Sequence, residues 1–325
     1  MGDPAGVGPE IVLKVALHPL TSCPMVVLGD VRTLQETAQR YHLPLTITAW
    51  RLDDSYPTDA NVLPVMEFSH LAADERQPGR PTAAGGEASY RYVEIGVRLA
   101  MEGKIGGLVT APISKAMWHA AGRVYPGHTE LLAALTHTPE VRMMLVGSQL
   151  RVILVTTHIA LAHVPSALSS ERILRTVAMT AAHLSRFHGI ACPRLAVAGL
   201  NPHAGENGAF GDEEARIIVP AVLQAREDGL DAHGPFPADS VFLRAVRGEF
   251  DAVICLYHDQ GLIPLKLLSW EDGVNVTIGL PIVRTSPDHG TAFDIAGQGT
   301  ANPRSLQAAL TLAAEMVRKK NSALQ

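Results

Sequence analysis

The sequence is poor in cysteine and aromatic residues. Among 325 residues there are three cysteines, Cys23, Cys192 and Cys255, and aromatic residues make up 5%. An odd number of widely spaced cysteines excludes a disulfide framework and does not support a cysteine-based metal site. We expect Cys192 and Cys255, in or beside strand-like runs, to be buried as small hydrophobic side chains in a reducing cytoplasm.

Long apolar runs and an excess of positive charge are also missing. No run approaches the roughly 20 residues of a membrane-spanning helix, and no basic-then-apolar leader indicates export. The formal net charge of -5 argues against a general attraction to nucleic acid or acidic membranes. With 47% hydrophobic and 18% charged residues, the chain has the composition of a globular, cytoplasmic protein with a large core.

Short apolar runs alternate with helical patterns along most of the chain. The strand-like runs are residues 25–30, 45–50, 62–66, 106–110, 142–146, 150–157, 194–200 and 251–257. Between them lie helical patterns, including one that Ser169 is placed to cap and that continues to about His188. This alternation predicts an α/β fold with a largely parallel sheet.

The densest group of polar residues lies between residues 251 and 299. The buried strand predicted at 251–257 is followed by the polar cluster 258–261, whose Gly261 we expect to free a turn. Lys266, Asn275 and Arg284 follow within a short stretch. Their density favours a site for an anionic ligand with a metal or a proton relay over a set of loop residues without a shared role.

Three histidines share one context, because each follows a predicted strand. These are His158, His203 and His258. In α/β sheets ligands bind at the carboxyl ends of the strands, so the three imidazoles can converge and bind a divalent metal. In that case Asp259 would orient an imidazole. The other interpretation is three separate histidines, each hydrogen-bonded at the edge of the sheet.

Charged residues near the third histidine indicate an anionic substrate. Arg284 can bind phosphate or carboxylate with two parallel hydrogen bonds, and Lys266 adds a point charge. Lys115 and Asp239 each lie at an element boundary and are candidates for proton transfer. A helix cap or a solvated charge is the alternative role for these two residues.

Several ordered motifs carry a family resemblance over nearly the whole chain. They are residues 2–10 (GDPAGVGPE), 110–115 (TAPISK), 125–130 (YPGHTE), 157–158 (TH), 201–206 (NPHAGE), 237–239 (PAD), 257–261 (YHDQG) and 284–291 (RTSPDHGT). With these motifs the sequence resembles the 4-hydroxythreonine-4-phosphate dehydrogenase family of pyridoxal phosphate biosynthesis. Members of that family carry a strand before the first motif, which here begins at Gly2.

The resemblance implies an architecture and an assembly. It implies a two-domain α/β fold like that of isocitrate and isopropylmalate dehydrogenases, which is not a Rossmann fold. The expected division is a discontinuous cofactor-side domain, 1–125 plus 276–325, and a middle domain, 126–275, with the metal ligands and dimer contacts. The resemblance also implies a homodimer whose active site lies at the subunit interface.

The resemblance further assigns roles to residues. The implied metal ligands are His158, His203 and His258, binding zinc, magnesium or cobalt. The implied substrate contacts are His128, Thr129, Lys266, Asn275 and Arg284. The run 289–297 resembles a nicotinamide-cofactor loop, which implies that NAD or NADP lies near His289, Gly290, Thr291 and Asp294.

The implied reaction is the oxidation of 4-phosphooxy-threonine to a 3-keto acid that loses carbon dioxide. A sister activity on D-threonate or D-erythronate 4-phosphate has nearly the same core motifs and stays open. Two alternatives belong to other classes. A metal-dependent phosphatase or hydrolase needs no nicotinamide, and a non-enzymatic sensor of phosphorylated sugar acids binds its ligand without turnover.

Overall fold

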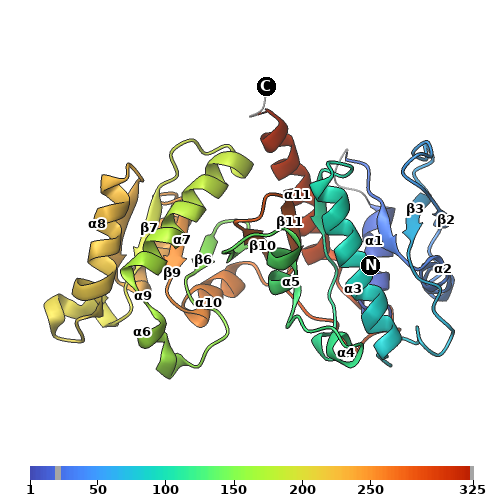
Figure 1. Cartoon of the computed structure of the whole chain (residues 1–325), viewed down its shortest axis with the longest axis horizontal. Coiled ribbons are helices and arrows are strands. Elements are labelled where there is room, and N and C mark those ends of the chain that lie inside the picture. Colours follow the sequence, from blue (N-terminus) through green and yellow to red (C-terminus); the bar gives the residue numbers. More distant parts are fainter. Residues whose placement is uncertain (19–22, 323–325) are drawn as a thin grey trace. The chain divides into compact units, whose positions relative to one another are not determined.

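The computed structural model describes residues 1–18 and 23–322, which form two compact units. Unit 1 comprises Met1–Pro139 and Leu280–Ala314, and unit 2 comprises Glu140–Gly279 and the chain from Glu315 (Figure 1). The α/β fold class predicted from the sequence is confirmed in both. The predicted functional domains, with boundaries at 125–126 and 275–276, stay a prediction.

Unit 1 is built on two groups of parallel strands. Its elements are α1 (Gly8–Leu17), β1 (Val27–Gly29), α2 (Val31–Arg40), β2 (Thr46–Ala49), β3 (Val62–Glu67), α3 (Ala83–Met101), β4 (Gly107–Val109), α4 (Lys115–Ala120), α5 (His128–Leu135), β11 (Val283–Pro287) and the first part of α11 (Arg304–Ser322). Strands β1, β3 and β2 form a parallel sheet in that order, and β4 pairs with β11 in parallel.

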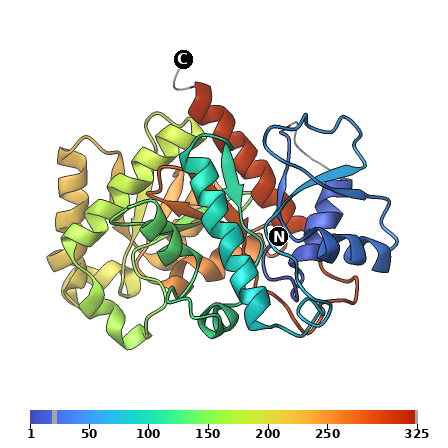
Figure 2. The same ribbon diagram turned by 45° about the vertical axis from the view of Figure 1, so that its right-hand side comes forward.

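Local sequence signals set the helix starts of unit 1. The Asp30 carboxylate accepts a hydrogen bond from Thr33 N at 2.8 Å and so caps α2. Thr82 caps α3 in the same way by accepting from Gly85 N at 3.1 Å. Helix α3 then packs against α4, α5, β1 and β4, which places it beside the strands of the unit (Figure 2).

Unit 2 holds the longer run of strands. Its elements are β5 (Arg142–Val146), β6 (Arg151–Leu154), α6 (Val164–Ala167), α7 (Ser170–His183), β7 (Leu195–Ala198), α8 (Val219–Glu227), β8 (Ala232–Phe236), α9 (Ala238–Val246), β9 (Ala252–Cys255), α10 (His258–Leu268), β10 (Val274–Ile278) and the end of α11. A short 3₁₀ segment at Leu161–His163, a turn at Pro202–Gly208 and π-helical turns at Leu184–His188 and Glu214–Ile218 complete it.

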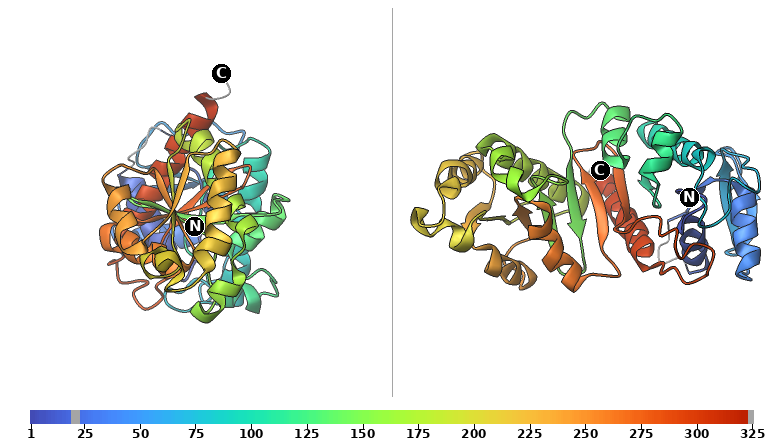
Figure 3. Two further views of the ribbon diagram at one scale, coloured as in Figure 1. Left: turned by 90° about the vertical axis from the view of Figure 1, so that its left-hand side faces the viewer. Right: turned by 90° about the horizontal axis from the view of Figure 1, so that it is seen from below.

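The strands of unit 2 follow the order β10-β5-β6-β9-β7-β8. Strand β9 is parallel to β6 and β7, and β8 is parallel to β7, whereas β5 is antiparallel to both β6 and β10. Helices α7 and α8 cover one face of the sheet, and α9 and α10 cover the other (Figure 3). Every residue of β7 and β9 is therefore buried, as expected for interior strands of a parallel sheet.

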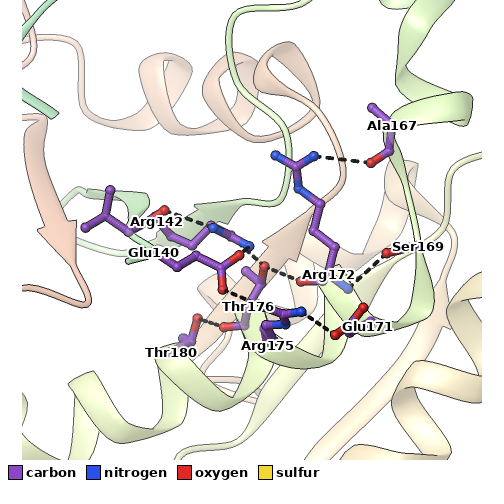
Figure 4. A network of polar contacts seen from close by, with 10 residues as sticks. Glu140, Arg142, Ala167, Ser169, Glu171, Arg172, Arg175, Thr176 and Thr180 are labelled. Atoms are coloured by element: carbon purple, nitrogen blue, oxygen red, sulfur yellow. Dashed lines mark hydrogen bonds and ion pairs between the residues drawn. The ribbon is translucent and has the colours of Figure 1, made fainter. Parts of the chain in front are cut away.

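A polar network holds α7 to strand β5 (Figure 4). Ser169 accepts from Arg172 N at 3.2 Å, which confirms it as the cap of this helix. The Arg142 Nε donates to Thr176 Oγ1 at 2.9 Å, and the same guanidinium pairs with Glu140. Thr180 donates its hydroxyl to the Thr176 carbonyl oxygen at 2.7 Å, so its polar atom is satisfied although it is fully buried.

The start of α10 differs from the sequence expectation. Residues 258–261 were expected to form a turn freed by Gly261, but α10 begins at His258 and includes this glycine. A Cβ at Gly261 would lie 2.9 Å from Cys255 Sγ and 3.2 Å from Val152 Cβ. Glycine is needed because the helix lies directly on strands β6 and β9.

Two further expectations need correction. Strand β8 is absent from the strand-like runs found in the sequence, because Pro235 lies inside it. Strand β8 is at the edge of the unit 2 sheet, where a missing N–H is tolerated. Cys192 is exposed rather than buried, whereas Cys255 is buried as expected.

No helix within residues 1–18 and 23–322 is long and apolar enough to cross a membrane.

Two histidines at the end of α7 lie inside unit 2. The ring centroids of His183 and His188 are 5.5 Å apart, and within the described part of the chain neither Nε2 has a hydrogen-bond partner. Burial, together with His188 and Arg186, lowers the pKa of His183 to about 3. Burial and the nearby Arg151 lower the pKa of His188 to about 4. Both imidazoles are therefore neutral in the folded protein at neutral pH.

We expect acid to destabilise the fold through His183. An unfolded histidine binds its proton near pH 6.5, whereas folded His183 stays neutral down to about pH 3. The contribution of His183 to the free energy of unfolding is therefore complete above pH 6.5 and decreases as the pH falls below 6.5. Between pH 6.5 and pH 5 this removes up to about 2 kcal/mol of unfolding free energy. Urea unfolding of His183→Gln should show a shallower pH dependence than wild type. The exposed His119→Gln is the control, and equal slopes in all three proteins would contradict the prediction.

Candidate active site

Arg284 is the centre of a basic cluster in unit 1. It lies on β11 with 2% of its surface exposed, and its Nη2 donates to Thr110 Oγ1 at 2.7 Å. Thr110 directly follows β4, and its backbone N–H donates to the Thr285 carbonyl oxygen at 3.0 Å. Burial lowers the pKa of Arg284 to about 10, so the guanidinium stays charged at neutral pH. A buried cation of this kind favours an anionic partner.

His128 belongs to the same cluster. It begins α5, and its ring packs edge-on against Trp118 with centroids 5.5 Å apart. Burial of the ring, followed by the charges of Arg284 and Lys115, lowers the pKa of His128 well below its ordinary value. Its Nε2 is buried, and no described residue accepts from it or donates to it. A neutral imidazole with a free ring nitrogen can therefore accept a hydrogen bond from a ligand or donate one to it.

Lys115 lies beside this histidine because of how its helix starts. The Ser114 hydroxyl caps α4 by accepting from Met117 N at 3.2 Å, which makes Lys115 the first helical residue. A Cβ built at Gly127 would lie 3.2 Å from Lys115 Cε, so the glycine leaves room for the lysine chain. The basic cluster, defined as Lys115, His128 and Arg284, is thus assembled from three separate segments of unit 1.

The predicted cofactor residues lie in the loop after β11. Val7 N donates to the Thr291 carbonyl oxygen at 2.9 Å, so the glycine-rich turn of residues 2–8 packs against this loop. At Gly6 any side chain would collide with Thr291, whose carbonyl oxygen lies 2.9 Å from the added Cβ. His289 and Asp294 are exposed, and nothing lies within 4 Å of the Cβ position of Gly290. The loop therefore presents open backbone beside a glycine-rich turn.

Helix α1 holds the far end of that loop. Lys14 Nζ donates to the Gly299 and Ala301 carbonyl oxygens at 2.8 Å each, and to Glu10 at 2.7 Å. The buried Glu10 carboxylate also accepts from Ala301 N at 2.8 Å. An ion pair within one helix thus fixes a segment almost three hundred residues away.

In unit 2 the structure brings two of the three predicted histidines together. The rings of His158 and His258 have centroids 5.5 Å apart. His258 Nδ1 and Asp259 Oδ1 are 2.7 Å apart, so the expected contact of Asp259 with an imidazole is present. Such a carboxylate fixes the ring orientation and leaves Nε2 for another partner, as in many metal-binding histidines.

His203 is not part of this pair. It lies in a turn where His203, Ala204, Glu206 and Asn207 all have φ between 42° and 54°. Within residues 1–18 and 23–322, no group of three or more His, Cys, Asp or Glu side chains is close enough to hold a metal ion. Imidazole nitrogens are suitable ligands for a divalent metal. This conformation, however, brings together only two of the three expected ligands, His158 and His258. The convergence of all three stays a prediction.

The other predicted residues of unit 2 lie on different elements. Lys266 is in the last turn of α10, with Nζ 5.3 Å from the centroid of the Trp270 ring. Asn275 lies on β10 opposite Leu145. Asp239 is exposed in the first turn of α9, a helix that contacts the turn holding His203. Thr129, in unit 1, is half-buried next to His128.

Sequence reasoning missed the residues that hold these groups in place. Thr110, which binds Arg284, reads as the last residue of a strand and is 174 positions away in the chain. Thr156, which the sequence placed in a strand, lies just after β6, and Gln260 lies in the first turn of α10; both side chains are buried. The signal available for Gln260 was its place directly after His258 and Asp259 in a polar cluster.

Comparison with known proteins identifies the family. A profile of the family described as "Pyridoxal phosphate biosynthetic protein PdxA" matches residues 21–313. The chain belongs to this family. The resemblance inferred from the motifs is therefore confirmed.

Relatives within the family have two different names. The chain is 50% identical over 324 residues to a 4-hydroxythreonine-4-phosphate dehydrogenase of Geobacter metallireducens, covering 99% of this chain and 95% of that protein. It is 45% identical to a D-threonate 4-phosphate dehydrogenase of Cupriavidus necator, covering 98% and 96%. The dehydrogenase names of these relatives support oxidoreductase activity for the chain.

A solved structure supports the fold. The crystal structure of 4-hydroxythreonine-4-phosphate dehydrogenase from Klebsiella pneumoniae matches with a TM-score of 0.89 and 42% identity, covering 98% of each chain. This agreement confirms an α/β fold with a mostly parallel sheet.

We expect Thr110→Val to weaken anion binding at the basic cluster. The change removes one hydrogen-bond acceptor of the buried Arg284 guanidinium at nearly constant volume, and a hydrogen bond to a charged group is worth about 1.5–3 kcal/mol. Calorimetric titration with inorganic phosphate should show affinity reduced about tenfold. Thr285→Val is the matched control, because its buried hydroxyl donates to the Ala309 carbonyl oxygen at 2.8 Å and does not touch Arg284. Equal phosphate affinity in both variants would argue against Arg284 as the anion ligand.

Proposed function

We propose that this protein is an NAD(P)-dependent dehydrogenase that oxidises 4-phosphooxy-threonine to the 3-keto acid. That product decarboxylates to 3-amino-2-oxopropyl phosphate, an amino ketone used in pyridoxal phosphate synthesis. The observation that carries the proposal is the buried Arg284 with its Thr110 partner beside His128, in a chain 50% identical to a relative of that name.

In this proposal the basic cluster binds the negative charge of the substrate. Arg284 is held by Thr110 and therefore keeps a fixed orientation toward a phosphate or carboxylate. His128 offers a neutral ring nitrogen, and Thr129 offers a hydroxyl next to it. Lys266 and Asn275 are assigned to the same substrate by the family resemblance. A guanidinium and an ammonium together favour a dianionic phosphate over a neutral group.

We assign a divalent metal, zinc, magnesium or cobalt, to His158, His203 and His258. Two of these rings already lie side by side, and Asp259 fixes one of them. A metal bound there would stabilise negative charge on the substrate oxygen during oxidation and decarboxylation. The imidazoles must be neutral to bind it, so acid would release it.

We assign the nicotinamide cofactor, NAD or NADP, to the loop holding His289, Gly290, Thr291 and Asp294. The packing of the glycine-rich turn on Thr291 and the open space at Gly290 support this assignment. The bound nicotinamide would accept a hydride from the substrate carbon, and the hydroxyl proton would pass to a base. Lys115, next to His128, and Asp239, exposed on α9, are the candidates for that base.

A second substrate, D-threonate or D-erythronate 4-phosphate, is favoured by one observation. The relative from Cupriavidus necator, named D-threonate 4-phosphate dehydrogenase, covers 98% of the chain at 45% identity. Both substrates carry a phosphate and a hydroxyl next to a carboxylate-bearing carbon, so the basic cluster fits both. They differ in that 4-phosphooxy-threonine carries an amino group where D-threonate and D-erythronate 4-phosphate carry a hydroxyl.

A substrate panel tests the proposed reaction. We expect NAD or NADP reduction at 340 nm with 4-phosphooxy-threonine, with a kcat/KM at least about tenfold above that with the D-threonate and D-erythronate phosphates. Prior treatment with a chelator should abolish turnover, and zinc, magnesium or cobalt should restore it. The same assay without cofactor, read as phosphate release, is the control for a phosphatase. Phosphate release without nicotinamide would contradict the proposal.

We propose that the protein forms a homodimer through α10. Ile263 and Leu267, which lie on one side of α10 at helical spacing, are 66% and 85% exposed, and Trp270, just beyond the end of this helix, is 78% exposed. An apolar row of this kind is costly to leave in water. Because His258 and Lys266 are on the same helix, a partner seated there would also border the proposed site.

We expect Leu267→Glu to convert the dimer into a monomer and to lower turnover. A carboxylate in an apolar interface must be desolvated without a partner, which costs several kcal/mol. Light scattering coupled to gel filtration measures the mass, and the dehydrogenase assay measures turnover. Leu223→Glu on α8, at a site with 53% exposure, is the matched control and should leave both unchanged. A monomer with full activity would contradict an active site shared between subunits.

A further inference from the structure

A chain of buried hydrogen bonds joins the three strand ends that precede the histidines. Leu256, after β9, is its centre. Its carbonyl oxygen accepts from Thr156 Oγ1 at 2.6 Å and from Thr156 N at 3.2 Å. Its N–H donates to Gln260 Oε1 at 2.7 Å, and Gln260 Nε2 donates to the Gly199 carbonyl oxygen at 2.7 Å. The chain therefore crosses from the end of β6 to the end of β9 and on to the end of β7.

These bonds lie just beyond the paired residues of the strands. The last paired residues of β7 and β9 are Val197 and Ile254, and those of β6 and β9 are Leu154 and Cys255. Backbone bonds from Val155 N and Thr156 N still join the ends of β6 and β9, whereas the side chain of Gln260 joins the ends of β9 and β7. The Gln260 amide spans the gap between β9 and β7 with one acceptor and one donor.

The bonded residues are close in sequence to the histidines. Thr156 precedes His158 by two positions and Leu256 precedes His258 by two, whereas Gly199 precedes His203 by four. Thr156 is 2% exposed and Gln260 is 6% exposed, so water does not replace these bonds when they break. A change in either side chain therefore removes a buried hydrogen bond that joins two strand ends, and loss of the Gln260 amide also leaves the Gly199 carbonyl oxygen without this donor.

A carboxylate, that of Glu214, also holds the turn of His203 in place. Glu214 is 5% exposed, and its Oε1 accepts from Leu200 N and Asn201 N at 2.7 Å each. Asn201 Nδ2 donates to its Oε2 at 3.0 Å. The turn is thus attached to the sheet through Gly199 and to the helical segment of Glu214 through the next two residues.

We propose that Gln260 is a positioning residue, which with Thr156 fixes the distances between His158, His203 and His258. Gln260 belongs to the first turn of α10, the helix that begins with His258, so its amide moves together with that imidazole. Its bond to Gly199 ties the His203 turn to this helix, and the bond of Thr156 ties the His158 segment to it. The inference rests on the proposed metal role of the three histidines.

Cobalt binding tests the inference without turnover. The metal-stripped full-length protein is titrated with Co²⁺, and the visible absorption band reports both affinity and coordination. Thr156→Val and Gln260→Met should each raise the Co²⁺ dissociation constant by about 10-fold to 100-fold and weaken the band. Thr156→Ser, which keeps the hydroxyl, should restore the wild-type titration.

Thr180→Val is the matched control. Its hydroxyl is also fully buried in unit 2 and donates to a backbone carbonyl oxygen at 2.7 Å, but it lies on α7 away from the strand ends. Urea unfolding should show a similar loss of stability in Thr180→Val and Thr156→Val, with cobalt binding changed only in the second. If Gln260→Met does not fold, the comparison of cobalt binding by Thr156→Val and Thr156→Ser tests the inference without it.

Two results overturn the inference in distinguishable ways. Wild-type affinity and band in Thr156→Val and Gln260→Met would refute positioning while leaving the metal site intact. A wild-type protein that does not bind Co²⁺ would refute the metal role of the histidines and, with it, this inference.

Discussion

The burial of parallel strands on both faces is the constraint on which the rest of unit 2 depends. Strands β7 and β9 are covered by helices on each side, so they admit apolar side chains along their whole length. Polar chemistry is therefore confined to the points where the strands stop. His158, His203 and His258 all occur just beyond such points, as do the side chains that hold them.

Unit 1 meets a similar constraint with charge. Arg284 lies inside the unit and remains ionised, which is costly unless its donors are used. The Thr110 hydroxyl accepts from this guanidinium, and the nearby Lys115 adds a second positive charge. Positive charge gathered in this way favours a bound anion. Burial of the ring, followed by the charges of Arg284 and Lys115, keeps His128 neutral.

Much of this could be predicted from the sequence because the signals were local. Apolar runs located β5, β6, β7 and β9, and Ser169 marked the start of α7. Local signals gave wrong predictions where contacts between distant segments determine the structure. Pro235 concealed an edge strand, and Gly261 has its role only because α10 lies on the sheet. Cys192 was wrongly expected to be buried, since an apolar neighbourhood in sequence does not ensure one in space.

The residues of the candidate site also fall into those that local sequence signals reveal and those that they do not. Histidines after strands can be found by spacing, but Thr110 and Gln260 are recognisable only from bonds that join distant segments.

The turn that holds His203 has an energetic consequence. Four of its residues that are not glycine adopt left-handed backbone angles, at a cost of about 1–2 kcal/mol each. The Glu214 carboxylate offsets part of this through its bonds to Leu200 and Asn201. These left-handed angles therefore store conformational energy in the turn, which the surrounding hydrogen bonds must hold in place.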